Sequence, residues 1–519
     1  YEKDSDISYS GCGMPYAIGD SVEVSELTPR DPVYFKQKYN IDIFVLHEVI
    51  SIDTAFKRLV VQNLQTQETF EDHYDQLVFS TGASAFIPSI EGVHQSHVFT
   101  LRTIQDMKKI KSFISSHIVQ DVAIIGSGFI GLELLENFKK IGLNVHIIEK
   151  LPQISPSLDD DVAWLVEDYL ANQGIDIITD ASIETIHHNT ILLTNRQAVK
   201  ADLVIVATGV KPNIALAKSI GVKLGTTGAI ETNAYMQTNL PDIYACGDCV
   251  EYPHQILNKP VYRPMGSTAN KTGRIVADHL FGIHSKFKGI LGTSIYKVLD
   301  LHVGQTGLSE KEALNAGFDV LSIFNIKPNK PEYMEGHELT IKVITNRTNG
   351  QLLGAQVIGF EGVDKRIDVF ATALSFKAKT SDLMDLDLAY APPFSTTKDP
   401  IIYSGMIVHN ALNRGRFLLT AQEVMNLIQN NVPCTIIDTR VPKQYAQGHV
   451  PGAINIPHEV FRTQIKSLDK SKLTITYCNK GVTGNATQNI LIHEGFEQVY
   501  SISGGYRTFK LRYDHMKGS

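Results

Sequence analysis

Two cysteines of the chain stand in settings that favour sulfur chemistry. Cys12 lies between two glycines and is followed by Met, Pro and Tyr, so small neighbours leave its sulfur accessible to a reaction partner. Cys478 follows a strand-type run, residues 473–477, and opens a short loop, residues 478–483, that leads into a predicted helix. The backbone amides of such a loop and of a helix N-terminus converge on the sulfur and stabilise a persulfide anion. The sequence therefore predicts two sulfur nucleophiles.

Cys12 has no second cysteine close to it, because the next one along the chain is Cys246. An internal dithiol is therefore not expected. A single redox cysteine can alternate between thiolate and sulfenic acid, or between thiolate and a mixed disulfide or persulfide formed with an external thiol. Cys246 and Cys249 form a Cys-x-x-Cys pair but flank Asp248 in a predicted turn, and no second ligand pair exists. Neither a dithiol site nor a metal site is predicted there.

A dinucleotide-binding motif lies between the two cysteines. A short apolar run of strand type leads into Gly126, Gly128 and Gly131, which have the spacing GxGxxG, and a helical pattern follows. The first glycine permits a tight turn, the second lets a pyrophosphate approach the backbone, and the third lets the helix pack on the strand. The helix N-terminus offers amide donors to the phosphates. Glu149, at the end of the next strand, can accept hydrogen bonds from ribose hydroxyls and favours NADH, while Lys150 leaves NADPH open.

Three further segments are predicted to be buried strands that end in turns. Residues 76–82 and residues 202–209 both end in Thr-Gly, and a glycine there lets the chain leave a sheet close to a bound nucleotide. Residues 239–248 place Asp248 between the end of a strand and the start of a helix. Around the GxGxxG motif, these segments resemble the pyridine nucleotide–disulfide oxidoreductase family, whose members have two Rossmann-like dinucleotide-binding domains.

The resemblance implies FAD and either NADH or NADPH as cofactors. In the family, the acid at the position of Asp248 contacts the ribityl and phosphate region of FAD, and Glu2 matches the acid that holds the adenosine ribose. In the family, about 30 residues that hold the first FAD loop precede this acid, judged from the size of a βαβ unit. This sequence lacks them, so the FAD-binding domain is expected to be truncated. The predicted cofactor-binding residues are Glu2, Thr81, Gly82, Gly126, Gly128, Gly131, Glu149, Gly209, Gly247 and Asp248.

Residues 8–19, which contain Cys12, resemble coenzyme A disulfide reductases and their persulfide-reducing relatives within this family. Ser8 matches a serine that contacts coenzyme A in these enzymes. Gly11 stands where they commonly have Asn, so one amide contact to coenzyme A is expected to be missing. Peroxide- and oxygen-reducing relatives share Cys-Gly-Met but usually lack the Pro-Tyr that follows here. Coenzyme A is therefore predicted as a substrate or bound ligand.

Residues from 292 to about 410 resemble the dimerisation domain of the same family. Close motif matches lie at residues 361–368 and 389–395. In the reductase, the tyrosine of Tyr-Ala-Pro-Pro reaches the cysteine of the partner subunit. The resemblance thus predicts a homodimer in which Tyr390 hydrogen-bonds or protonates the leaving sulfur. Tyr333 is the predicted second active-site tyrosine, although the family has a Tyr-Tyr pair there; interface packing is the alternative for both.

The end of the chain resembles a rhodanese domain. Asp-x-Arg at residues 438–440, Gly-His-x-Pro-Gly-Ala at 448–453, Cys-x-x-Gly at 478–481 and Gly-Gly-Tyr at 504–506 occur in that order. The short loop after the cysteine favours a sulfur substituent over a phosphate. The resemblance gives three substrate-binding residues: Lys480, Gly481 and Thr483. Sulfurtransferases often have Arg at the last of these positions, and the lysine could supply the missing charge.

Composition excludes several classes of protein. The chain has 519 residues, 43% hydrophobic and 20% charged, which suits three or four domains. A net charge of −7 argues against nucleic-acid binding. Five scattered cysteines favour a reducing cytoplasm over a disulfide framework. Neither a membrane-spanning apolar run nor a signal-peptide pattern is found, so a cytoplasmic protein without membrane contact is expected.

These observations predict an α/β protein of four domains. They are an FAD-binding domain (1–90 and 216–288), an NAD(P)H-binding domain (91–215), an α+β dimerisation domain (289–411) and an α/β rhodanese domain (412–519). The predicted function is FAD-dependent reduction, by NAD(P)H, of coenzyme A disulfide, coenzyme A persulfide or polysulfide. Two alternatives stay open: an NADH peroxidase or oxidase that uses a Cys12 sulfenic acid, and a sulfur carrier or redox sensor with a decayed flavin site.

Overall fold

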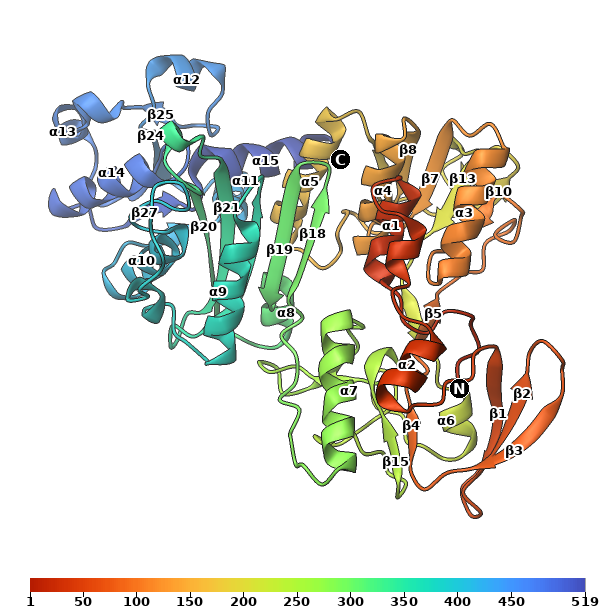
Figure 1. Ribbon diagram of the computed structural model, residues 1–519. Coiled ribbons are helices and arrows are strands. Elements are labelled where there is room, and N and C mark those ends of the chain that lie inside the picture. Colours follow the sequence, from red (N-terminus) through yellow and green to blue (C-terminus); the bar gives the residue numbers. More distant parts are fainter. Residues whose placement is uncertain (519) are drawn as a thin grey trace. The chain divides into compact units, whose positions relative to one another are not determined.

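The computed structural model describes residues 1–518, and the chain folds into two compact units. The first unit comprises Tyr1–Ser155 and Ala171–Ile290; the second comprises Pro156–Leu170 and the described residues from Leu291 onward. Figure 1 labels the elements and colours the chain from residue 1 in red to residue 519 in blue.

The first unit contains a five-stranded parallel sheet of Rossmann type. Its strands, in spatial order, are β6 (Val98–Phe99), β13 (Leu203–Val206), β7 (Asp121–Ile125), β8 (Asn144–Ile148) and β9 (Asp176–Ile178). The central strands are continuous apolar runs because parallel strands are covered on both faces. The helices that follow β6 and β7 are α3 (Ile104–Ser116) and α4 (Phe129–Lys140). The GxGxxG glycines thus lie at the carboxyl end of a central strand, where open α/β sheets bind ligands.

Short sheets and helices make up the rest of the first unit. The sheets are β1–β2–β3 (His47–Asp53, Arg58–Asn63, Thr69–His73), β10–β11–β12 (Ile183–His187, Thr190–Leu193, Ala198–Lys200), β4–β15 (Leu77–Phe79, Ile243–Ala245), β5–β14 (Ala83–Ala85, Val210–Pro212) and β16–β17 (Tyr252–Pro253, Pro260–Val261). The helices are α1 (Met14–Ile18), α2 (Pro32–Tyr39), α6 (Ala215–Ser219) and α7 (Gly266–Leu280), with 3-10 turns η1 (Gly11–Gly13), η2 (Val24–Leu27) and η3 (Gly247–Cys249).

The second unit contains a five-stranded antiparallel sheet. Its spatial order is β18 (Ser294–Val298), β19 (Leu301–Gly307), β22 (Leu352–Gly359), β21 (Glu338–Asn346) and β20 (Val320–Pro328). Every residue of β22 is buried, as expected for a strand covered on both faces. The accompanying elements are α8 (Glu310–Asn315), η4 (Glu332–Met334), α9 (Val363–Ser375), η5 (Asp382–Met384) and α10 (Pro400–Asn413), and Figure 1 shows α9 lying along the sheet.

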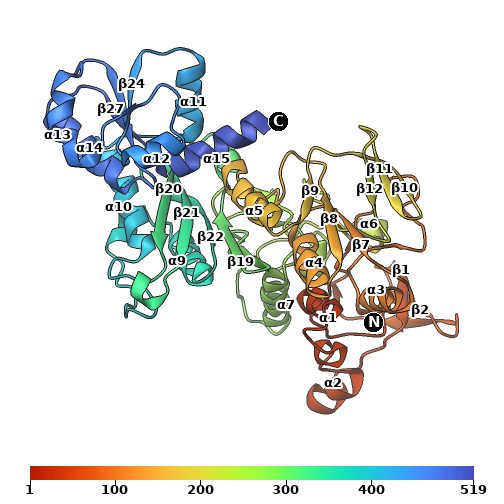
Figure 2. The same ribbon diagram turned by 90° about the horizontal axis from the view of Figure 1, so that it is seen from above.

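A second, parallel sheet follows in the same unit. Its spatial order is β23 (Leu418–Leu419), β27 (Val499–Ile502), β26 (Leu473–Tyr477), β24 (Cys434–Asp438) and β25 (Ile454–Asn455). Its helices are α11 (Ala421–Gln429), α12 (Pro442–Gln447), α13 (Phe461–Gln464), α14 (Val482–His493) and α15 (Gly505–Gly518), with turns η6 (His458–Val460) and η7 (Ile465–Ser467). Figure 2 shows these helices around the sheet. The predicted rhodanese segments therefore form one α/β fold.

Contacts through α5 (Asp160–Asn172) link the parts of the second unit. The guanidinium of Arg512, on α15, lies 3.1 Å from the Asp160 carboxylate, and His515 stacks on Trp164 at a centroid distance of 4.8 Å. At the start of the same helix, the buried ammonium of Lys342, on β21, lies 2.7 Å from the Asp161 carboxylate. These contacts explain why residues 156–170 group with the second unit, although the prediction assigns them to the NAD(P)H-binding domain.

One local expectation is wrong. The sequence predicts that a helix starts at Asp248, but the structure has only the single 3-10 turn η3 there, and α7 begins at Gly266. The turn ends because the chain returns to extended backbone at Val250, which has a φ of −113° and a ψ of 144°. Among residues 1–518, no helix combines the length and the apolar character needed to cross a lipid bilayer.

Candidate functional site

Cys12 lies at an exposed turn held by a buried helix. It is the middle residue of η1, and the next residues form α1, whose Met14 and Ile18 are buried. This helix packs against α3 and α4 of the nucleotide-binding sheet. No atom lies within 4 Å of the position that a Cβ on Gly11 would take, so the space beside the turn is open. The fold thus fixes the backbone of Cys12 while its sulfur stays accessible.

Three charged groups act on the Cys12 thiol. Partial burial raises its pKa, and the carboxylates of Glu133 and Asp248 raise it further, while Arg102 lowers it. The Arg102 guanidinium donates hydrogen bonds of 2.8 Å to the Asp248 carboxylate and to the carbonyl of Ala83. The sequence pointed to Asp248 but missed Arg102, which comes from the loop before α3 and carries no motif.

Glu133 is a second residue that sequence reasoning missed. It lies on α4, two residues after Gly131, and is half-buried. Burial raises its pKa to about 7, and the neighbouring Glu136 carboxylate contributes to this rise. Glu133 therefore exchanges its proton near neutral pH, close to a cysteine whose chemistry consumes and releases protons. The available signal was the acidic pair Glu133 and Glu136 among the apolar residues of the first turns of this helix.

The GxGxxG turn has the shape that a dinucleotide needs. Gly126 has a φ of +99°, and a Cβ there would lie 2.6 Å from the carbonyl oxygen of Ala207. A Cβ on Gly131 would collide with the carbonyl oxygen of Gly126, whereas a Cβ on Gly128 would meet no atom within 4 Å. The N-cap residue of α4 is Gly128, which has no side chain to cap the helix N-terminus. These residues fit the pyrophosphate of NADH or NADPH.

Glu149 anchors the same turn. Its buried carboxylate accepts hydrogen bonds from the amide and the hydroxyl of Ser127, at 2.9 and 2.6 Å, and from the amide of Leu151 at 2.9 Å. The acid predicted to hold the ribose thus also fixes the glycine turn on which the phosphates would lie. Its role toward a ribose stays a prediction.

Asn213, which lies four residues after Gly209, is hydrogen-bonded to the first Thr-Gly turn. The Thr81 hydroxyl donates to the Asn213 carbonyl at 2.6 Å, and the Asn213 side-chain amide donates back to the Thr81 carbonyl at 2.8 Å. Gly82 and Gly209 have φ values of +64° and +107°, which strongly favour glycine. The Thr208 hydroxyl donates to the Phe86 carbonyl at 2.7 Å, so the second turn lies close to the segment that follows Gly82. Asn213 is a further residue that the sequence did not single out.

The remaining predicted FAD residues lie in the first unit as well. The amide of Gly247 donates to the Thr272 hydroxyl at 3.3 Å, which ties η3 to α7. No side chain caps the N-terminus of α7, and a Cβ on Gly266 would meet no atom within 4 Å. Glu2 forms a parallel bridge with Val45. The open, uncapped helix end and the exposed Thr-Gly turns fit an anionic dinucleotide such as FAD.

The remaining residues predicted around Cys12 divide between the units. Ser8 is half-buried in the first unit, close to Cys12 in sequence. Tyr390 and Tyr333 belong to the second unit, where their side chains are 48% and 74% exposed. Exposure leaves both tyrosines available to another molecule. Their contact with a partner's cysteine stays a prediction.

Cys478 lies at the carboxyl end of β26, as predicted. It is 7% exposed, and its sulfur accepts a hydrogen bond from the amide of Gly481 at 3.2 Å. Gly481, with a φ of +100°, is the N-cap of α14. The amide of Tyr506, at the start of α15, donates to the Cys478 carbonyl at 2.8 Å. Two helix N-termini thus converge on the loop, and Thr483 lies in the first turn of α14.

Basic residues surround this loop. The Lys480 ammonium forms an ion pair with Glu338 of β21, and Arg507 of α15 pairs with the second oxygen of the same carboxylate. Cys478 and Lys480 are the groups whose charges act on Lys327 of β20. The predicted Lys480 therefore lies beside the cysteine. Sequence reasoning missed Lys327, Glu338 and Arg507, and the first two of these belong to the preceding sheet.

Other candidate groups are structural. Cys246 and Cys249 are buried free cysteines, and burial raises the pKa of Cys246 to about 12. Arg440 donates to Asp438 at 2.6 Å, so the Asp-x-Arg motif is a buried ion pair. Among the described residues, no cluster of His, Cys, Asp and Glu side chains has an arrangement suited to a metal ion.

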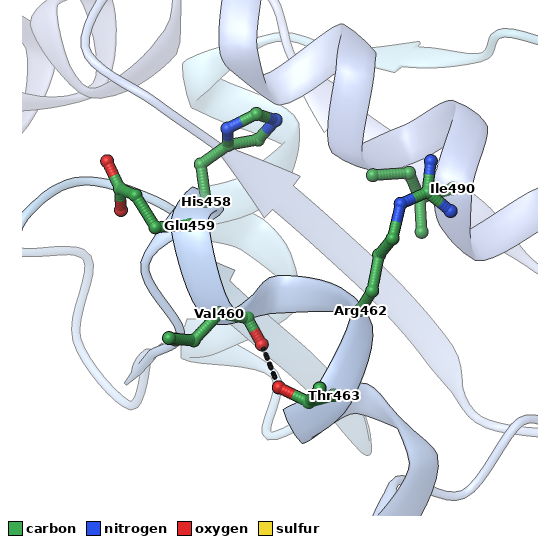
Figure 3. A pocket seen from close by; sticks show the side chains of 6 residues that line it. All are labelled: His458, Glu459, Val460, Arg462, Thr463 and Ile490. Carbon is green, nitrogen blue, oxygen red and sulfur yellow. Dashed lines mark hydrogen bonds between the residues drawn. The ribbon is translucent and has the colours of Figure 1, made fainter.

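A pocket lies on the parallel-sheet part of the second unit, and Figure 3 shows the side chains that line it. It has a volume of about 310 Å³ and contains none of the predicted site residues. The Thr463 hydroxyl, on one of the lining side chains, donates to the Val460 carbonyl at 2.8 Å. The residues that line it are His458, Glu459, Val460, Arg462, Thr463 and Ile490.

Comparison with known families matches three consecutive parts of the chain. Residues 1–265 match the family described as pyridine nucleotide-disulphide oxidoreductase, and residues 293–400 match its dimerisation domain. Residues 420–512 match the rhodanese-like domain. The predicted order of these parts is confirmed.

Similar proteins include a curated relative and two solved structures. The NAD(P)H sulfur oxidoreductase (CoA-dependent) of Pyrococcus furiosus is 38% identical over 408 residues, or 76% of this chain and 89% of the relative. Reduced Bacillus anthracis CoADR-RHD is 33% identical, with a TM-score of 0.96 and coverage of 98% of this chain and 92% of that one. A NAD-dependent persulfide reductase from A. fulgidus is 32% identical, with a TM-score of 0.90 and coverage of 98% and 94%.

Proposed function

The chain belongs to the pyridine nucleotide-disulphide oxidoreductase family, and we propose that it is an FAD-dependent NAD(P)H reductase of coenzyme A disulfide, coenzyme A persulfide or polysulfide. The observation that carries the proposal is the solitary, exposed Cys12 on a turn whose following helix packs on the nucleotide-binding helix α4. Names of similar proteins support the same chemistry, since they describe CoA-dependent sulfur reduction and persulfide reduction.

The proposed chemistry begins with the Cys12 thiolate. It attacks one sulfur of a coenzyme A disulfide, so a mixed disulfide forms and one coenzyme A leaves as its thiolate. FAD, when bound, would pass on the electron pair of NAD(P)H that breaks this mixed disulfide and releases the second coenzyme A. Glu133, whose pKa is about 7, holds or returns a proton beside Cys12. A coenzyme A persulfide would release sulfide in place of one thiol.

A homodimer completes the proposed site. Tyr390 would contact the Cys12 of the partner subunit and protonate the leaving sulfur, and Tyr333 would lie beside it. Support comes from the match to a dimerisation domain and from the exposure of both tyrosines. The four domains keep the proposed boundaries 1–90 with 216–288, 91–215, 289–411 and 412–519. Free cysteines throughout the described chain support a reducing cytoplasm.

Cys478 would take up or hand over sulfane sulfur as a persulfide. The amide of Gly481 and the two helix N-termini would stabilise its anion, with Lys480 and Thr483 toward the substrate. Small-molecule sulfur compounds would thus be handled at two cysteines of one chain.

Cys12→Ser is the variant that tests the main reaction. In stopped-flow experiments with the flavin-loaded protein, it should abolish disulfide turnover, because no nucleophile remains, while NADH still bleaches the flavin. Cys434→Ser, at a half-buried cysteine outside the predicted sites, should behave like the wild type. Unchanged disulfide turnover in Cys12→Ser would refute the assignment.

A substrate panel separates the alternatives. NADH consumption with coenzyme A disulfide, coenzyme A persulfide and polysulfide, scored together with sulfide release, should exceed consumption with peroxide or oxygen. Vigorous peroxide reduction without any disulfide or persulfide activity would establish a Cys12 sulfenic acid enzyme instead. A purified chain that takes up no FAD would establish a carrier or sensor.

A further inference from the structure

The carboxylate of Glu149 is largely occupied by donors of the chain itself. One oxygen, Oε2, accepts hydrogen bonds from the amide and from the hydroxyl of Ser127, at 2.9 and 2.6 Å. The other oxygen, Oε1, accepts a hydrogen bond from the amide of Leu151 at 2.9 Å. A carboxylate has about four lone-pair sites, so the described residues leave about one of them open, on Oε1.

The contact between Ser127 and Glu149 is a fixed feature of the fold. Glu149 is 7% exposed, and Ser127 is 0% exposed. The carbonyl of Ser127 accepts a hydrogen bond from the amide of Ser155 at 3.2 Å. The amide of Glu149 donates to the carbonyl of Ile178 at 2.8 Å, and its carbonyl accepts from the amide of Ala181 at 3.0 Å. Both backbones are therefore held in place while the side chains meet in a buried setting.

A bound ribose would compete with Ser127 for this carboxylate. In dinucleotide-binding folds, the acid at this position accepts a hydrogen bond from the ribose 2′-hydroxyl of NADH, where NADPH has a 2′-phosphate. A buried acceptor that already has a donor gains little from a further one, whereas an acceptor without a donor favours the ligand that supplies it. The Ser127 hydroxyl thus occupies a lone pair that could otherwise distinguish the two coenzymes.

The charges around Glu149 also favour weak discrimination. Three hydrogen-bond donors compensate the negative charge of its carboxylate, and this compensation weakens the repulsion of a 2′-phosphate. The next residue, Lys150, is exposed, so its ammonium is accessible to a phosphate group. Neither coenzyme therefore meets a strong penalty at this end of β8.

We propose that Ser127 is the positioning residue that sets coenzyme specificity: its hydroxyl occupies Glu149, and the chain therefore accepts NADH and NADPH with similar affinity. The inference deepens the proposed function and rests on it for the use of a nicotinamide dinucleotide. Removal of the hydroxyl frees a lone pair on Oε2 of Glu149. The dual-coenzyme site then becomes selective for NADH.

Equilibrium binding to the flavin-loaded, full-length protein tests this inference. The ligands are the oxidised coenzymes NAD⁺ and NADP⁺, which differ at the same 2′ position but cannot reduce the flavin, and isothermal titration calorimetry gives each Kd. The wild type should bind the two with Kd values within about tenfold of each other. Ser127→Ala should strengthen NAD⁺ binding roughly tenfold without strengthening NADP⁺ binding, because only NAD⁺ donates a hydroxyl to the freed, charged acceptor.

Two controls separate this effect from a structural one. NAD⁺ that lacks the adenosine 2′-hydroxyl should gain nothing from Ser127→Ala, whereas a general change in the loop would alter the binding of both ligands alike. Ser115→Ala removes an exposed hydroxyl that donates to the Ser112 carbonyl on α3, and it should leave every Kd unchanged. Ser127→Gly removes the same hydroxyl as Ser127→Ala and should give the same shift, which keeps the test open if one variant does not fold.

Three results would overturn the role of Ser127. They are a wild-type preference for either coenzyme beyond about tenfold, an unchanged ratio of the two Kd values in both Ser127 variants, and equal gains for NAD⁺ and its 2′-deoxy analogue. Wild-type protein that binds neither coenzyme would overturn the proposed NAD(P)H-dependent function itself. The two failures are therefore distinguishable.

Discussion

Glu133 is the residue whose charge is expected to tune Cys12. Its carboxylate raises the pKa of the Cys12 thiol, and its own pKa is about 7, so this effect is present mainly above neutral pH. Glu133→Gln should therefore increase the rate of Cys12 alkylation at pH 8 by roughly two- to tenfold, as expected for a thiol pKa lowered by a fraction of a unit to one unit. The pH profile of alkylation by iodoacetamide measures this.

The same residue affects stability. The pKa of Glu133 rises from 4.5 to about 7 on folding, so the folded chain binds more protons than the unfolded chain in this range. The free energy of unfolding therefore falls as pH rises from 4.5 to 7. Glu133→Gln should lessen the accompanying decrease in Tm. Glu184→Gln, at an exposed carboxylate of β10, serves as the control. Identical alkylation profiles for Glu133→Gln and wild type would rule out an electrostatic role.

At the scale of elements, the glycines between β7 and α4 have two different roles. Gly131 is needed for packing, and Gly128 is expected to leave room for a ligand. Gly131→Ala should lower unfolding free energy by about 1–3 kcal/mol, because its Cβ would overlap the Gly126 carbonyl. Gly128→Ala should change stability by less than about 0.5 kcal/mol, because its backbone φ of −73° suits alanine and the space is open. Chemical denaturation measures both.

The affinity for NADH should depend on Gly128, whose substitution leaves stability nearly unchanged. Gly128→Ala should weaken binding roughly tenfold because its methyl group would occupy space intended for the pyrophosphate. A Gly128→Ala variant that binds NADH like the wild type, measured by protein fluorescence, would show that the pyrophosphate lies elsewhere.

At the scale of the whole molecule, dimerisation is expected to bring Tyr390 to a partner. Phe394 lies in the same segment and is 72% exposed in the single chain. Phe394→Asp should weaken the dimer by about 2 kcal/mol or more, roughly a thirtyfold rise in Kd, because an apolar contact is replaced by a charge. Sedimentation velocity would measure this, and disulfide turnover should fall with the dimer fraction.

Phe281→Asp, at an exposed phenylalanine after α7 in the first unit, is the matched control and should stay dimeric. Full disulfide turnover by a monomeric Phe394→Asp protein would contradict the proposed contribution of the partner subunit's Tyr390.

The sequence alone determined the features that depend on neighbouring residues. Glycine spacing at Gly126, Gly128 and Gly131 predicted the nucleotide turn, and the apolar runs before Gly126 and Cys478 predicted strands that the structure has. Such features are readable because φ angles and strand burial are set by local residue types. The same local reasoning failed at Asp248, where the chain returns to extended backbone at Val250 after a single 3-10 turn.

Only the tertiary structure decided which charges surround each cysteine. Arg102 donates to Asp248, which lies 146 residues away in the sequence. Glu338, on the antiparallel sheet, forms an ion pair with Lys480 in the loop after β26. Glu133 acts on Cys12 because α1 packs on α4. Electrostatic interactions depend on distance in space and on burial, and neither follows from the spacing of residues along a chain.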